Sequence, residues 1–143
     1  MNGVVVDASI ALAWCFPDET SDYADGVLVS LEGKTILVPA IWGLEIANAV
    51  LVGERRKRLN QPEIVQFTAL LGALSLVQDV RPVANYVNDV LPLARKHGLS
   101  AHDAAYLELS IRYDAPLATL DEKLRKAAKR TGIKIFEGST KPD

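Results

Sequence analysis

The sequence predicts a single three-layer α/β domain with a central, mostly parallel sheet, spanning its 143 residues. Three observations lead to this fold class. Short apolar runs rich in β-branched residues alternate with longer segments whose apolar residues recur at helical spacing, as in α/β proteins. The length suits one domain with one core. No linker, low-complexity segment or internal repeat divides the chain.

The first half is expected to alternate strand and helix. Residues 3–6 form a continuous β-branched run, typical of a strand buried on both faces. Residues 18–31 carry apolar side chains at helical spacing, and Gly33 offers a stop before the apolar run at residues 35–38. Residues 40–56 are then expected to form a helix.

The second half continues the alternation. A helix over residues 62–74 is expected to form a hairpin with the one before it. Pro92 is expected to kink or divide the helical stretch that ends near His97. The other expected elements are strands at residues 76–80, 116–119 and 133–136, and helices at residues 101–113 and 121–131.

Composition excludes several classes of protein. Apolar residues make up 49% and charged residues 24%, which is ordinary for globular domains and argues against disorder or a fibrous repeat. The N-terminal segment lacks a basic leader and carries Asp7 inside its apolar run, so we expect a cytoplasmic protein with no signal peptide or membrane span. The single cysteine, Cys15, is expected to pack in the core rather than react.

Charge is unevenly distributed although the net charge is only -2. Residues 1–50 contain seven acids and one base, whereas residues 121–143 contain four acids and seven bases. An acidic front suits a cation site, and basic clusters such as residues 55–58 are candidates to meet phosphates around it. The alternative for any one cluster is a solvated helix end.

Asp7 and Asp121 each stand where an expected strand ends and a helix begins. Ligands of open α/β sheets bind outside the carboxyl ends of the strands, so both carboxylates are candidate site residues. The alternative for each is an N-cap of the following helix, with Ser9 as another candidate cap near Asp7.

Glu45 and Asp103 are the candidates on helices. The helical neighbours of Glu45 are apolar and no base lies within one turn, so it needs a metal or a partner elsewhere in the chain; Asn48 extends the same polar streak. Asp103 follows Ser100 by three residues and also suits the start of a helix dipole. It shares a side with apolar residues, however, and so faces inward, whereas Glu108 and Arg112 look like an exposed pair on another side.

Four carboxylates in one pocket need a counter-charge. Each close pair repels by about 4 kcal/mol at 4 Å with an effective dielectric near 20. Oxygen donors without a His/Cys cluster favour Mg²⁺ or Mn²⁺ over zinc, and we expect neither His97 nor His102 to be a ligand.

Four motifs carry a family resemblance. They are VVVDAS at residues 4–9, PAIWGLEIAN at residues 39–48, SAHDAAY at residues 100–106 and ATLD at residues 118–121. In this order and spacing the sequence resembles the PIN-domain ribonucleases, most closely the VapC toxins of bacterial and archaeal toxin–antitoxin pairs. His102 is a departure, because the family often has an aromatic residue before the aspartate.

The resemblance implies a fold, a site and partners. The fold would be a PIN-like α/β/α domain with a parallel five-stranded sheet between helices. The four acidic residues of the active site would be Asp7, Glu45, Asp103 and Asp121, supported by the polar residues Ser9, Asn48 and Thr119. The implied activity is Mg²⁺- or Mn²⁺-dependent endonucleolytic cleavage of RNA, and a cognate antitoxin would block the site; we also expect a homodimer.

Two other functions are compatible with parts of this pattern. One is a catalytically silent PIN-like module that binds RNA or a protein. The other is a phosphatase with an aspartyl nucleophile, which is disfavoured because such enzymes commonly need D-x-D and Ser9 stands two residues after Asp7.

Overall fold

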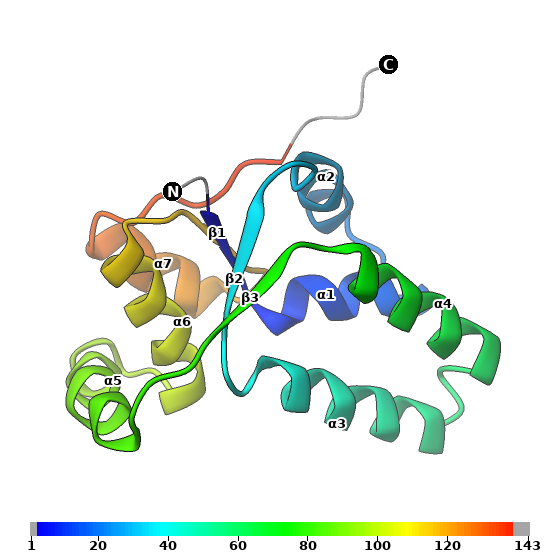
Figure 1. Cartoon of the computed structure of the whole chain (residues 1–143), viewed down its shortest axis with the longest axis horizontal. Helices are drawn as coiled ribbons and strands as arrows, with labels where there is room; N and C mark the ends of the chain where they lie inside the picture. Colours follow the sequence, from blue (N-terminus) through cyan, green and yellow to red (C-terminus); the bar gives the residue numbers. More distant parts are fainter. Residues whose placement is uncertain (1–2, 139–143) are drawn as a thin grey trace.

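The computed structural model describes residues 3–138, and at its centre lies a four-stranded sheet of order β3-β2-β1-β4 (Figure 1). The strands are β1 (Gly3–Val6), β2 (Thr35–Pro39), β3 (Leu76–Asp79) and β4 (Leu117–Ala118). All three pairings are parallel. Parallel neighbours need crossover connections, and helices supply them, as the predicted fold class requires.

The expectation of five strands is wrong for the described residues, which form four. The last expected strand contributes only an isolated parallel bridge between Leu117 and Ile135. The Leu117 N–H donates to the Lys134 carbonyl at 3.0 Å, and the Phe136 N–H donates to the Leu117 carbonyl at 2.8 Å. Because β4 is only two residues long, it offers too short an edge for a full ladder.

Helices cover both sides of this sheet. In Figure 1, α5, α6 and α7 group on one side of the strands, and α1, α3 and α4 lie on the other. The α-helices are α1 (Ala8–Cys15), α2 (Asp22–Ser30), α3 (Trp42–Arg55), α4 (Gln61–Ala73), α5 (Val83–His97), α6 (Ala101–Tyr113) and α7 (Glu122–Arg130).

One helical segment begins later than expected, and another continues through a proline. The helix expected over residues 18–31 begins only at Asp22, after a 3₁₀ turn at Pro17–Glu19, because Ser21 accepts a capping hydrogen bond from the Ala24 N–H at 3.1 Å. Pro92 lies inside α5 without dividing it. It sits on the exposed side of the helix, where water can satisfy the carbonyl that loses its partner.

The core lies between β1, α1 and α6. Val5 and Val6 of β1, Ile10 of α1 and Leu107 of α6 are fully buried. Cys15 is also in this core, where burial raises the pKa of its thiol to about 11, as expected of a packing residue rather than a nucleophile. Within residues 3–138, no helix combines the length and the apolar character needed to cross a membrane.

Candidate active site

Asp7 lies at the carboxyl end of β1, immediately before α1, and is only 6% exposed. Asp7 occupies the N-cap position of α1, as the alternative expected, but its side chain makes no capping hydrogen bond. Instead, Asp7 Oδ2 accepts hydrogen bonds from Thr119 Oγ1 at 2.6 Å and from Ser9 Oγ at 2.9 Å. The sheet register explains the first contact, because Val6 pairs with Ala118 and the next residue of each strand leaves the sheet at the same edge.

The electrostatics of Asp7 are those of a buried anion without a cation. Burial raises the pKa of Asp7 above its usual range, and the Asp103 carboxylate adds to this effect. The hydrogen bonds from Thr119 and Ser9 act in the opposite direction but do not cancel it. An ionised Asp7 is therefore costly in the protein alone and would be stabilised by a positive charge.

Thr119 and Ser9 also fix the loop that follows β4. Thr119 is fully buried, and its Oγ1 accepts a hydrogen bond from the Asp121 N–H at 3.0 Å. Ser9 Oγ accepts one from the Leu120 N–H at 3.2 Å. The two hydroxyl groups thus hold both Asp7 and the backbone that presents Asp121.

Asp121 and Asp103 are half-buried at the starts of two helices. Asp121 is the N-cap of α7, because its Oδ1 accepts a hydrogen bond from the Leu124 N–H at 2.9 Å. The expected alternative, that Asp121 caps the following helix, is therefore confirmed. Asp103 lies in the first turn of α6, where Ser100 is the N-cap. Burial and then the nearby Asp121 carboxylate raise the pKa of Asp103, so these two acids also lie within electrostatic range.

Glu45 reaches the site from the first turn of α3. The start of α3 is anchored on the sheet by Trp42, whose indole Nε1–H donates to the Val6 carbonyl at 2.9 Å. Glu45 Oε1 accepts a hydrogen bond from the Tyr106 hydroxyl at 2.7 Å. Its partner from elsewhere in the chain is therefore a neutral hydroxyl, which leaves the negative charge of the carboxylate uncompensated.

Tyr106 contacts Glu45 in the site, although the sequence predicted only that it lies on the same side of its helix as Asp103. Its side chain is fully buried, and its hydroxyl donates to Glu45 and accepts from the Ala8 N–H at 3.3 Å. Burial, the bond to Glu45 and the charge of Asp7 all raise its pKa, so it stays a neutral donor. Its position in the sequence could have indicated this role. Tyr106 follows Asp103 by three residues on the inward-facing side of the helix, and a buried tyrosine hydroxyl needs a hydrogen-bond partner.

The acids surround one region without forming a closed cage. Asp103 interacts electrostatically with both Asp7 and Asp121, and Tyr106 links Glu45 to Asp7 by a hydrogen bond to the first and a charge interaction with the second. Within residues 3–138, however, no three His, Cys, Asp or Glu side chains are grouped closely enough to hold a metal ion ready-made. The donor set fits a hard cation that keeps several waters, such as Mg²⁺, because its oxygens are anionic and, within residues 3–138, form no ion pair with a basic side chain.

Asn48, expected as a supporting residue, and the two histidines, which were not expected to be ligands, have the following positions. Asn48 is exposed and, among the described residues, makes no polar contact with the four acids. His102 is exposed next to Asp103. His97 is buried at the end of α5, where its Nδ1 lies 3.5 Å from the Arg130 guanidinium.

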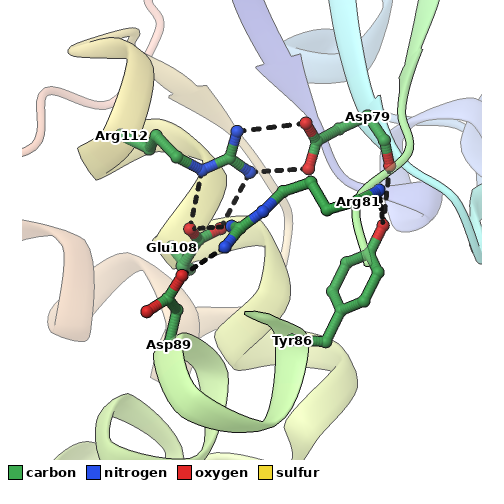
Figure 2. Close-up of polar contacts among 6 residues, drawn as sticks. All are labelled: Asp79, Arg81, Tyr86, Asp89, Glu108 and Arg112. Atoms are coloured by element: carbon green, nitrogen blue, oxygen red, sulfur yellow. Dashed lines mark hydrogen bonds and ion pairs between the residues drawn. The ribbon is translucent and has the colours of Figure 1, made fainter. Parts of the chain in front are cut away.

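The helix that carries Asp103 and Tyr106 is fixed by a network of charges at its other end (Figure 2). Arg81 donates to Glu108 Oε1 at 2.6 Å and also to Asp89. Arg112 donates to Glu108 Oε1 at 2.7 Å and bidentately to Asp79 at 3.0 and 2.6 Å. The expected Glu108–Arg112 pair therefore forms, but Glu108 is buried, because Arg81 covers it from the end of β3.

Comparison with known proteins gives three findings. A family model described as PIN domain matches residues 4–130. The chain is 31% identical over 121 residues to Ribonuclease VapC3 of Pyrobaculum aerophilum, covering 85% of this chain and 91% of that protein. It also shares its fold with two solved structures at lower identity.

The first is VapBC2 from Rickettsia felis bound to a DNA fragment from their promoter, with a TM-score of 0.66 at 14% identity over 96% of this chain and 99% of that chain. The second is FitAcB from Neisseria gonorrhoeae, with a TM-score of 0.61 at 19% identity over 94% and 96% of the two chains.

Proposed function

The chain belongs to the PIN-domain family, and from that premise we propose that it is a metal-dependent endoribonuclease, the toxin of a VapC-type toxin–antitoxin pair. The observation that carries this proposal is the buried Asp7 carboxylate, held at the carboxyl edge of the sheet beside Asp103 and Asp121. Identity to a protein named as a ribonuclease supports RNA as the substrate.

In this proposal, Asp7, Asp103 and Asp121 hold Mg²⁺ or Mn²⁺ directly. Such an ion, when bound, lowers the pKa of a water and neutralises charge on the phosphate. Glu45 holds the ion through a water or accepts the proton of the attacking water. Thr119 and Ser9 orient Asp7, and Tyr106 orients Glu45, through the hydrogen bonds already described.

The proposal is tested by incubating the protein with total cellular RNA and Mg²⁺ or Mn²⁺, and mapping the cut ends. We expect discrete cuts that disappear with a chelator and with Asp7→Asn. Asp114→Asn is the matched control, because Asp114 is an exposed acid at the opposite end of α6, in a left-handed conformation that asparagine tolerates. Cleavage by Asp7→Asn at the wild-type rate would show that the assignment is wrong.

A second candidate function is a catalytically silent module that binds RNA or a protein. The observation that favours it is the absence, within residues 3–138, of three acidic side chains grouped closely enough to hold a metal. A purified sample that neither binds Mn²⁺ nor cuts any RNA would establish this function instead.

We also propose a cytoplasmic antitoxin partner, which inserts an arginine or lysine among the four acids in place of metal and substrate. The raised pKa values of Asp7 and Asp103, caused by burial and by neighbouring acids, support this mode of inhibition, since a cation would stabilise both carboxylates. We expect a small protein to co-purify from native cells, and its addition to stop RNA cleavage. Recovery of the chain alone from those cells would count against this partner.

A further inference from the structure

A row of positive charge begins beside the acidic site and follows α7 away from it. Lys123, Lys126 and Arg130 are all exposed and are spaced three and four residues apart, so they lie on one stripe of the helix. Lys96, exposed in the last turn of α5, adds a fourth charge. We call Lys96, Lys123, Lys126 and Arg130 the basic stripe.

Contacts between α5 and α7 place these charges together. Lys123 reaches the end of α5, because its Nζ lies 3.9 Å from where a Cβ on Gly98 would be. The Arg130 guanidinium lies 3.5 Å from Nδ1 of His97, the residue after Lys96. Figure 1 shows α5, α6 and α7 on the same side of the molecule, and α6 carries Asp103.

The basic stripe forms no close ion pair among the described residues. Within residues 3–138, the arginines that form ion pairs are Arg58, Arg81 and Arg112, and no carboxylate pairs with a member of the stripe. Like charges three and four residues apart on a helix repel each other. This repulsion disfavours α7, and an anion from outside would relieve it.

The helix dipole explains some of this charge but not all of it. Cations in the last turn of a helix are favourable, which accounts for Lys96 of α5 and Arg130 of α7. Lys123 lies in the first turn of α7, where the dipole disfavours a cation. A partner with negative charge explains the position of Lys123, and the dipole does not.

The basic stripe also begins next to the acidic site, as a substrate-binding surface should. Asp121 caps α7, and Lys123 follows it by two residues. The charge of Lys123 acts on Asp103, whose pKa it lowers against the effects of burial and Asp121. From Lys123 to Arg130 the helix rises about 10 Å, so the stripe leads directly away from the carboxylates.

We propose that the basic stripe is the track that holds the phosphates of an RNA strand on one side of the bond to be cut. This inference rests on the proposed function and assigns its substrate contacts. Contacts to phosphates position a strand without reading its sequence, so the stripe supplies affinity rather than specificity. Bases are then left for other surfaces to recognise.

The other exposed basic cluster, at the end of α3, does not suit this role. Arg55 is the last residue of α3, about 15 Å along the helix from Glu45. Its neighbour Arg58 is already engaged, since it donates to Asp18 at 2.7 Å and to Glu19 at 2.9 Å. Arg55 and Arg56 therefore provide a matched control of equal charge.

The test is fluorescence anisotropy of a labelled 20-nucleotide RNA with the full chain, in EDTA so that no cleavage occurs, over a series of salt concentrations. We expect Lys123→Gln/Lys126→Gln to weaken binding at least tenfold at low salt. We also expect the slope of log affinity against log salt to fall by about 1.4, or about 0.7 for each phosphate that the variant no longer neutralises. Arg55→Gln/Arg56→Gln should leave both quantities unchanged, and the stripe variant should be at least as stable as wild type because it is relieved of repulsion.

Three outcomes would overturn the proposal. They are equal binding by the stripe variant and wild type, equal weakening by both double variants, and a stripe variant that binds RNA normally but no longer binds the antitoxin. The last result would make the stripe a protein-docking surface. Binding is measured without metal and is therefore independent of cleavage. If the protein binds RNA through the basic stripe but cuts no RNA, the proposed function is wrong and the stripe is still an RNA-binding surface.

Discussion

At the scale of single residues, hydroxyl groups decide how the carboxylates of the site are presented. Thr119 and Ser9 both donate to Asp7, and Tyr106 donates to Glu45. None of these donors carries a positive charge, so they orient the acids without neutralising them. The negative charge of the pocket is thus kept available for a cation.

Asp7→Asn is predicted to stabilise the metal-free protein while abolishing its activity. Burial raises the pKa of Asp7, so its ionised form costs folding free energy. The protonated form incurs no such cost below the unfolded-state pKa, near 3.9, and the penalty appears as pH rises through the raised folded-state pKa. In EDTA at pH 7 we expect a gain on the order of 1 kcal/mol, or about 2–4 °C in Tm.

Thermal melts of the two proteins between pH 4 and pH 7 measure this effect. The difference in Tm should grow with pH and should shrink when Mn²⁺ is added to wild type. A variant that is less stable than wild type at every pH would contradict the assigned burial cost.

Tyr106→Phe is predicted to impair catalysis more than folding. The ring still fills the core, but Glu45 loses its donor and the Ala8 N–H loses its acceptor. We expect a loss of about 1–2 kcal/mol in unfolding free energy and about a tenfold fall in metal-dependent RNA cleavage. Tyr113→Phe is the control, since its ring is exposed and lies against the Arg112 guanidinium. Equal cleavage rates for the two variants would remove Tyr106 from the site.

At the scale of elements, the carboxyl ends of β1 and β4 could be predicted because β1 is an apolar run that stops at Asp7 and β4 is a short apolar run that Asp121 follows within three residues. Glu45 could be predicted because its helical neighbours are apolar. The long-range hydrogen bonds that orient these acids could not be derived from periodicity, since Thr119 lies 112 residues from Asp7 and Tyr106 lies 61 residues from Glu45; Thr119 was expected only through the family resemblance. Local periodicity carries no information on pairings at that range.

The burial of Glu108 could not be predicted, for the same reason. Its i,i+4 neighbour Arg112 is visible in the sequence, whereas Arg81 lies 27 residues away at the end of β3. The prediction of a fifth strand was also wrong. The apolar run near Ile135 does not show that β4 is only two residues long and pairs with this run only at an isolated bridge.

Glu108→Gln is predicted to loosen the attachment of α6 to β3 and α5. Both Arg81 and Arg112 would lose a charged acceptor in a largely covered position. We expect a loss of about 2 kcal/mol, between the values for exposed and fully buried ion pairs. Urea denaturation measures it, with Glu54→Gln on the exposed end of α3 as the control. Equal stability of the two variants would show that the network does not hold α6.

At the scale of the whole molecule, one side brings together three different surfaces. The acidic site lies at the carboxyl edge of the sheet, and the basic stripe leaves it along α7. An apolar groove of about 500 Å³ lies between the start of α3, α5 and α6. Next to this groove, Val80 and Val83 are 76% and 80% exposed, which is unusual for side chains of this size in a monomer.

A homodimer formed through this apolar surface is the corresponding prediction. Val87 lines the groove and is itself exposed, so Val83→Lys/Val87→Glu should leave the fold intact while disrupting association. Size-exclusion chromatography with light scattering should give a dimer for wild type and a monomer for the variant. A wild-type protein that is monomeric at about 100 µM would rule the dimer out, since obligate interfaces persist at such concentrations.

The central claim is that the carboxylates around Asp7 hold a divalent cation, and calorimetric titration of Mn²⁺ into the metal-free protein tests it most directly. We expect saturable binding by wild type and by Asp114→Asn, and loss of binding in Asp7→Asn. Equal binding by Asp7→Asn and wild type, or no binding by wild type, would contradict it.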